Sequence, residues 1–199
     1  MPMPPHDPQA ELDLLARLKQ GEETAFVALY RRHRDAVYRF ALLYCGSTAA
    51  AADVTQETFI HLMSRPDQFD PARGSVGPWL CGVARNLARK LAGIREDATD
   101  PAELGDDAGL DDARIEHDGP LERVLRNEAA EHLRRAIAAI PAHYRDVLIL
   151  CDLDDFSYAE AAQVCGIDIG TVRSRLFRAR AHLAQRLAPY ASAAKEASR

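Results

Sequence analysis

Apolar residues recur every three or four positions along most of this chain, which is the period of an amphipathic α-helix. No segment alternates apolar and polar residues as a half-buried β-strand would. The pattern therefore predicts an all-α protein. Its strongest stripe predicts a long helix from Glu22 to about Cys45, with its inward face formed by Phe26, Leu29, Tyr30, His33, Val37, Phe40, Ala41 and Tyr44.

Three further helices are predicted in the first half of the chain, over Leu12–Lys19, Thr48–Met63 and Pro78–Ala92. Glycines end the first two helices of this half, Ser47 is a suitable N-cap, and Pro78 fits a first helical turn. A loop rich in Pro and Gly precedes Pro78. The last helix carries an apolar stripe that consists of Leu80, Val83, Ala84, Leu87 and Leu91.

The second half begins with a helix that ends near Ile140, and Pro141 opens the next one. Ser157 and Glu160 have the spacing of a capping box for a short helix over Tyr158–Val164. Gly166 allows a sharp turn, and Asp168 can cap the last helix. A short helix, a glycine turn and a second helix make a helix-turn-helix. The apolar positions of its second helix are Val172, Leu176, Ala179, Leu183 and Leu187.

The net charge of −5 is unevenly spread along the chain. Residues 96–122 contain eleven of the 30 acidic residues and one of the 25 basic ones, so the rest has 19 acids and 24 bases. We predict two small helical domains, residues 10–94 and 120–190, joined by a flexible acidic linker at 95–119. Residues 1–9 and 191–199 are predicted to be disordered. The linker is interpreted as a solubilising spacer, with the shielding of a basic face by nucleic-acid mimicry as the alternative.

The segment Gly170–Arg180 has four arginines and no acidic residue. A merely solvated helix face would carry interleaved glutamates, and a membrane-surface helix needs an apolar face that here has to pack against its neighbours. DNA binding is therefore favoured, since arginine bonds guanine edges and phosphates and an exposed phenylalanine suits a thymine methyl group. The side chains predicted to lie on or near the outward side are Arg173, Ser174, Phe177, Arg178 and Arg180, with Arg175 at the margin.

Three stretches together resemble the extracytoplasmic-function (ECF) group of bacterial sigma factors, in the sigma-70 family. They are "AADVTQETFIHLM", "FDPARGSVGPWLCGVARNLARKL" and "IPAHYRDVLILCDLDDFSYAEAAQVCGIDIGTVRSRLFRARAHL". The resemblance implies a protein that binds core RNA polymerase and directs promoter-specific initiation, and that is held inactive by an anti-sigma factor. One departure is Ala161, where an isoleucine or leucine is usual, and it leaves the basic face unchanged.

The resemblance also implies a role for each surface. A helix face formed by positions i, i+3, i+4 and i+7 would dock on the β′ clamp helices of the polymerase, and it consists of Asp53, Gln56, Glu57 and Ile60. The β flap would be a second polymerase contact of the chain. The −35 promoter element would be read by Thr171, Arg173, Ser174, Arg175, Phe177 and Arg178. The melted −10 element would be read by Arg73, Ser75, Val76, Trp79, Arg85, Asn86, Arg89 and Lys90. Trp79 is interpreted as a core or pocket-wall residue in preference to a stacking platform.

No catalytic constellation, cofactor motif or metal-ligand spacing stands out, so we predict neither an enzyme nor a metal or cofactor site. The four cysteines are interpreted as buried apolar residues of a reducing cytosol, with a thiol sensor as the alternative. The absence of a long apolar run and of a secretory pattern predicts a cytoplasmic protein without membrane insertion.

Two functional alternatives remain. One is a stand-alone helix-turn-helix regulator, which does not explain the stretches in the first half. The other is an interaction protein that imitates a sigma factor in order to titrate an anti-sigma factor.

Overall fold

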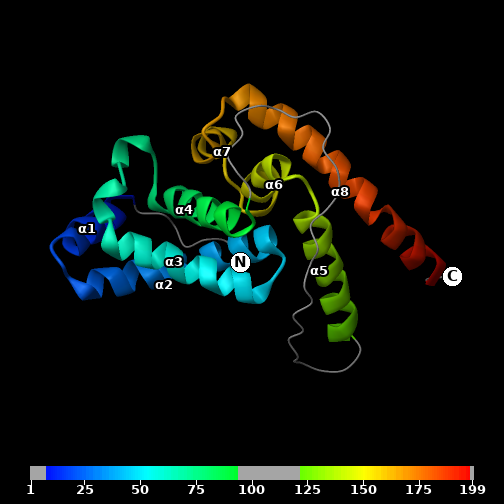
Figure 1. Ribbon diagram of the computed structural model, residues 1–199, viewed down its shortest axis with the longest axis horizontal. Coiled ribbons are helices and arrows are strands. Elements are labelled where there is room, and N and C mark those ends of the chain that lie inside the picture. The colour runs from blue at the N-terminus through cyan, green and yellow to red at the C-terminus, as the bar shows by residue number, and fades with distance from the viewer. Residues whose placement is uncertain (1–7, 94–121, 198–199) are drawn as a thin grey trace.

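The computed structural model describes residues 8–93 and 122–197, and this part of the chain is helical and contains no strand (Figure 1). The all-α prediction is confirmed. The first stretch forms an N-terminal bundle of α1 (Pro8–Lys19), α2 (Glu23–Cys45), α3 (Thr48–Ser64) and α4 (Val76–Leu91). Two short 3-10 turns, η1 (Pro66–Gln68) and η2 (Pro71–Arg73), occupy the loop between α3 and α4.

The core of the N-terminal bundle follows the predicted stripe on α2. Leu29, Val37 and Phe40 are fully buried there, while Phe26 and Tyr30 are only half-buried at its edge. Gly46 ends α2 in the left-handed conformation, at φ 70°, and Ser47 caps α3 by accepting a hydrogen bond from the Ala50 amide. These two residues fold α3 back along α2, so that the two helices pack side by side (Figure 1).

The second stretch forms a C-terminal bundle. Its helices are α5 (Glu122–Ala138), α6 (Ala142–Leu148), a π-helical segment η3 (Ile149–Leu153), α7 (Tyr158–Cys165) and α8 (Ile169–Ala197). The capping box is present, because the Ser157 hydroxyl accepts from the Glu160 amide at 3.2 Å and the Glu160 carboxylate accepts from the Ser157 amide at 2.9 Å. Gly166 turns the chain at φ 68°, and α7 and α8 form the predicted helix-turn-helix.

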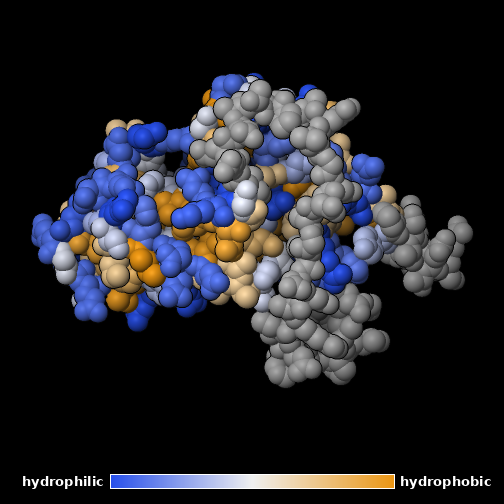
Figure 2. Space-filling view, viewed as in Figure 1, coloured by the Kyte–Doolittle hydropathy of each residue, from blue (hydrophilic) through white to orange (hydrophobic). Residues whose placement is uncertain are grey.

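The two bundles pack against each other, which the sequence pattern does not predict. Helix α4 contacts α7, and α2 contacts both α5 and η3. The buried apolar residues of both bundles form one continuous cluster. The Arg145 side chain of α6 donates a 2.7 Å hydrogen bond to the Tyr44 carbonyl of α2. On the face seen in Figure 2, apolar residues gather in the middle of the N-terminal bundle and hydrophilic residues surround them.

Helix α4 differs from the prediction in its start and in its buried face. It begins at Val76, and Pro78 lies within its first turn. Its apolar stripe is rotated, since Val83 and Leu87 are half-buried and Leu91 is 60% exposed. The buried side chains of α4 are Val76, Pro78, Leu80, Cys81, Ala84, Arg85, Ala88 and Arg89. The reason is that α4 packs on two sides, against its own bundle and against the C-terminal bundle.

Helices also extend further at both ends than predicted. Helix α1 starts at Pro8, and α8 continues to Ala197, so residues 191–197 of the predicted disordered tail are helical. Alanine is frequent in this last stretch and is the strongest helix former, which explains the extension. The predicted acidic linker, residues 95–119, lies outside the described residues.

The capping box generates a test of local stability. Ser157→Ala is expected to lower the free energy of unfolding by about 1 kcal/mol, because the Glu160 amide loses its acceptor. Urea unfolding followed by circular dichroism measures the change. Glu160→Gln is the matched control, since glutamine fills the same role in a capping box. Equal destabilisation by both variants would contradict the capping explanation.

Candidate nucleic-acid and protein interfaces

The first turns of α8 present the basic face that the sequence predicts to point outward. Val172, Leu176 and Ala179 are fully buried against the rest of the C-terminal bundle. The side chains on the opposite face are exposed, and they are Arg173, Ser174, Phe177 and Arg178. Phe177 is 77% exposed, so its ring is available to a partner surface. The predicted orientation of this face is confirmed, and its role in DNA binding stays a prediction.

Local hydrogen bonds organise the start of α8. The Asp168 carboxylate accepts from both the backbone amide and the hydroxyl of Thr171, at 2.8 and 2.7 Å. These bonds lower the pKa of Asp168 below its ordinary value. The Ser174 hydroxyl donates to the Thr171 carbonyl at 3.0 Å, and Arg178 donates to the Tyr144 hydroxyl at 3.2 Å. Arg175 and Thr171 are half-buried at the margin of the face.

The membrane-surface interpretation of α8 has no apolar face left to use in this region. The residues that would enter a bilayer, Val172, Leu176 and Ala179, are the ones buried in the bundle. Among the described residues, no helix combines the length and apolarity needed to span a membrane.

A groove of about 450 Å³ lies beside the loop that precedes α4. Its walls include five of the side chains predicted to read the −10 element, namely Arg73, Ser75, Trp79, Asn86 and Lys90. The Trp79 ring meets the Phe69 ring edge-on, with centroids 5.7 Å apart, and the His61 ring at 6.1 Å. Trp79 is half-buried and forms a wall of this groove, as its interpretation as a pocket-wall residue predicts.

Three other residues of the predicted −10 set lie elsewhere. Val76 is 1% exposed, so it packs in the core and offers no surface to a nucleic acid. Arg85 and Arg89 are expected on an open face but are 6% and 9% exposed. Their position on the side of α4 that meets the C-terminal bundle explains this difference.

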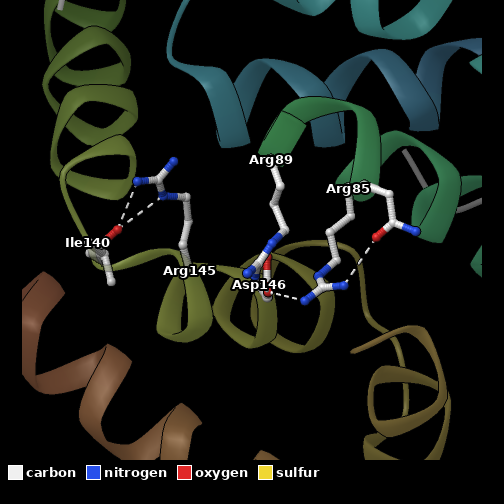
Figure 3. A network of polar contacts seen from close by, with 6 residues as sticks. Arg85, Arg89, Ile140, Arg145 and Asp146 are labelled. Atoms are coloured by element: carbon white, nitrogen blue, oxygen red, sulfur yellow. Dashed lines mark hydrogen bonds and ion pairs between the residues drawn. The ribbon is translucent and has the colours of Figure 1, made fainter. Parts of the chain in front are cut away.

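Both buried arginines bind one carboxylate of the C-terminal bundle. Asp146 of α6 is 1% exposed, and its Oδ2 lies 2.8 Å from Arg85 Nη2 and 3.1 Å from Arg89 Nη1 (Figure 3). Burial lowers the pKa of the Arg85 guanidinium, but the charge and hydrogen bond of Asp146, together with smaller effects of its neighbours, raise it by more, so the net shift is upward. Arg145 points away from this pair and donates two hydrogen bonds to the Ile140 carbonyl, at 3.1 and 2.9 Å.

A second ion pair links the bundles. Arg39 Nε of α2 lies 2.9 Å from Asp154 Oδ1, which follows η3, and the Asp154 side chain is 4% exposed. The roles of Arg39, Arg145, Asp146 and Asp154 are not predicted from the sequence. Charged residues at helical spacing are typical of a solvated helix face, so the sequence pattern does not distinguish these buried or bonded charges from exposed ones.

The predicted protein-docking face on α3 is open. Asp53, Gln56 and Glu57 are exposed, and Ile60 is 39% exposed. A groove of about 630 Å³ adjoins it, with walls that include Gln56, Ile60, Tyr30, Tyr38 and Met63. Met63 is not among the predicted residues, although it continues the same helix face three residues after Ile60. The structure brings together the four predicted residues, and their partner stays a prediction.

The cysteines are free thiols in this structure. Burial raises the pKa of Cys45 and Cys151 to about 11 and that of Cys165 to about 12. Cys81 is the most buried of the four, and its pKa is raised as well. Thiols with raised pKa values react slowly, which favours a packing role over a sensor. No cluster of three potential metal ligands occurs in the described ranges.

Comparison with known proteins matches both bundles to one family. The family model for Sigma-70 region 2 matches residues 29–93, and that for Sigma-70, region 4 matches residues 130–183. The ECF RNA polymerase sigma factor SigW of Bacillus subtilis is 30% identical over 179 residues, which cover 87% of this chain and 94% of SigW. SigE of Mycolicibacterium smegmatis, another ECF sigma factor, is 33% identical over 82% of this chain, and the match spans 62% of that longer relative.

Solved structures agree with these relatives. CnrH, in complex with the cytosolic domain of CnrY, has a TM-score of 0.67 and 27% identity, over 90% of this chain and 98% of CnrH. The sigma factor RpoE of Bartonella quintana, in complex with the anti-sigma factor NepR, has a TM-score of 0.58 and 25% identity over 81% of this chain and 96% of RpoE. The two regions occur in the same order in one helical chain, and this chain therefore belongs to the ECF group of the sigma-70 family of RNA polymerase sigma factors.

Proposed function

We propose that this chain joins core RNA polymerase through its N-terminal bundle and directs initiation at promoters that it reads with both bundles. The observation that carries the proposal is the exposed face of α8, where Phe177 lies between arginines in the first turns of the second helix of a helix-turn-helix. Such a helix enters the major groove with its N-terminal residues. No enzymatic activity is needed for this role.

The −35 element is assigned to the α8 face. Arg173 and Arg178 can bond guanine edges or phosphates, and Phe177 can pack on a thymine methyl group. Thr171, Ser174 and Arg175 are assigned to phosphate contacts at its margin. The Thr171 hydroxyl already donates to Asp168, so its contribution would be as an acceptor or through reorientation.

The −10 element is assigned to the groove beside α4. Trp79 forms a wall of the groove, and Arg73, Ser75, Asn86 and Lys90 supply polar groups around it. A groove with an aromatic wall and polar edges suits an unpaired base of a melted strand. Val76 supports the loop from the core and makes no contact in this assignment, and Arg85 and Arg89 can reach phosphates only when the C-terminal bundle moves away.

Polymerase docking is assigned to the α3 face, which consists of Asp53, Gln56, Glu57 and Ile60. Its two carboxylates would pair with basic residues on the β′ clamp helices, and Ile60 with Met63 would add apolar contact next to the groove. The β flap is proposed as the contact of the C-terminal bundle. Because polymerase and promoter DNA are the partners, we place the active protein in the cytoplasm.

An anti-sigma factor is proposed as the regulator. The support comes from a structural relative, RpoE of Bartonella quintana, which was solved in complex with the anti-sigma factor NepR. CnrH was likewise solved with the cytosolic domain of CnrY. If the regulator of this chain is anchored in a membrane, it would hold the inactive chain there.

The deciding experiment combines the full chain, core RNA polymerase and a promoter library, followed by sequencing of the transcripts. Initiation at a shared sequence pattern is expected. A gel shift of duplex DNA by the chain alone, without any promoter-specific initiation, would favour a stand-alone regulator. Absence of both activities, with an anti-sigma factor still bound, would favour the titrating interaction protein.

The α8 assignment predicts the effect of one substitution on DNA affinity. Arg178→Ala is expected to weaken binding of the polymerase complex to promoter DNA by about 1–3 kcal/mol, because one arginine contact is lost. Equilibrium binding to labelled promoter fragments, with and without the −35 element, measures the change. Arg31→Ala, which removes an exposed arginine of α2, is the control. An equal loss on fragments that lack the −35 element would contradict the assignment.

The α3 assignment predicts a loss of polymerase binding. Asp53→Lys is expected to abolish co-purification with core polymerase, because it reverses an exposed charge within the docking face. Its thermal unfolding is expected to match the wild type, since the side chain lies in solvent. Asp13→Lys makes the same charge change on α1 as the control. Normal co-purification of the Asp53 variant would refute the docking assignment.

A further inference from the structure

The side of α4 that carries Arg85 and Arg89 is the surface along which the two bundles meet. Both guanidinium groups converge on the single carboxylate of Asp146 (Figure 3). The neighbouring polar residues Asn86 and Lys90 are exposed and line the groove. The predicted −10 reading face is thus divided, with one half open and the other half covered by the C-terminal bundle.

Asp146 makes the contacts that a DNA phosphate would make. A carboxylate and a phosphate both accept charge-assisted hydrogen bonds from guanidinium groups at about 2.7–2.9 Å. The 2.8 Å contact between Arg85 Nη2 and Asp146 Oδ2 is of this kind. Because Asp146 and both arginines are nearly fully buried, a nucleic-acid strand has no path to them while the bundles are in contact.

Further contacts hold the C-terminal bundle in this place. Asp154 pairs with Arg39, and Arg145 bonds the Tyr44 carbonyl and lies over the Tyr44 ring at 5.0 Å. Helix α7 covers the edge of the groove. A Cβ placed on Gly74 would lie 3.2 Å from the Gln163 amide, and one placed on Gly82 would lie 3.8 Å from Val164. Gln163 and Val164 themselves line the groove.

The ion pairs between the two bundles can be replaced by contacts with another anion. Arg85 and Arg89 both lie against Oδ2 of the one Asp146 carboxylate, and guanidinium groups bind phosphate oxygens in the same way. Asp146 Oδ1 and Asp154 Oδ2 have no hydrogen-bond partner in the part of the chain that the structure describes. Burying ions costs solvation that one ion pair only partly offsets, so a polyanion that binds the arginines can compete with Asp146.

The contact leaves the other DNA-reading face open. Arg173, Ser174 and Phe177 of α8 are exposed in the same arrangement. The contact therefore covers part of the predicted −10 reading face on the N-terminal bundle and leaves the predicted −35 reading face on the C-terminal bundle open.

We propose that two carboxylates of the C-terminal bundle, Asp146 and Asp154, dock on α4 and α2 in place of a DNA strand. In this closed state the chain can bind −35 duplex but not the melted −10 strand. Release of Asp146 frees Arg85 and Arg89 for phosphates. This inference rests on the proposed function for the meaning of the two DNA elements, whereas the docking itself is a property of the free chain.

The docking is tested first without DNA or polymerase. Gly82→Cys and Val164→Cys are introduced into the full chain after its four native cysteines have been replaced by alanine. A Cβ placed on residue 82 lies 3.8 Å from Val164 Cγ1, which occupies a position open to the sulfur of a cysteine at 164, so a disulfide between the two positions is within reach. With oxidised glutathione the pair is expected to cross-link within one chain, and adding Asp146→Asn is expected to slow cross-linking about tenfold.

Asp152→Asn is the matched control, because it removes the same charge from an ion pair with Arg180 inside the C-terminal bundle. It is expected to leave the cross-linking rate unchanged. Failure of the pair to cross-link, or equal rates with and without Asp146→Asn, would overturn the docking. Circular dichroism of each variant establishes that it is folded. These results hold whether or not the chain initiates transcription.

The consequence for DNA is tested with the same cross-linked chain. The probes are a −35 duplex and a single-stranded −10 oligonucleotide, both taken from a promoter identified in the transcription experiment. The oxidised chain is expected to keep its affinity for the duplex and to lose at least about tenfold in affinity for the single strand, and reduction is expected to restore it. Single-cysteine chains exposed to the same oxidant control for damage. Unchanged single-strand affinity after cross-linking would overturn the inhibitory role. Loss of both affinities in the reduced chain as well would instead refute the proposed function.

Discussion

Helix α4 must satisfy two packing surfaces at once, and much of the structure depends on this constraint. One side supplies Leu80, Ala84 and Ala88 to the core of the N-terminal bundle, and the next side places Arg85 and Arg89 against α6 of the C-terminal bundle. A helix with only one buried side would leave its arginines in water. Because both sides are covered, two arginines that would ordinarily be solvated are buried in a contact between the bundles. Burying a charge without a partner is costly, and Asp146 supplies the opposite charge that offsets this cost.

Small residues make the close approach of the two bundles feasible. Gly82 of α4 faces Val164 of α7, and Gly74 of the preceding loop faces Gln163. At these points even one additional carbon atom would be in contact with the opposite bundle. The same glycines border the groove that we assign to the −10 strand, so one set of residues serves both the contact between bundles and the surface offered to DNA.

The two reading surfaces are built on different principles. The α8 face is rigid, because buried Val172, Leu176 and Ala179 fix one side of the helix and thereby orient the other. The −10 surface is composite, since a loop with two 3-10 turns, an aromatic wall and one side of α4 all contribute to it. A surface assembled from several elements is more easily altered by a neighbour, which is why the C-terminal bundle can cover part of it.

The amino-acid sequence alone determined which segments are helical, several of their caps and the outward side of α8, because these depend on residues three or four positions apart. The predicted capping box at Ser157 and the turn at Gly166 follow from local chemistry and are confirmed. The burial of Arg85, Arg89 and Val76 was decided only by the tertiary structure. Their surroundings come from residues far along the chain, and Arg89 meets Asp146 across 57 positions. A periodic pattern records which side of a helix is apolar, but it does not record which distant carboxylate will lie against the polar side.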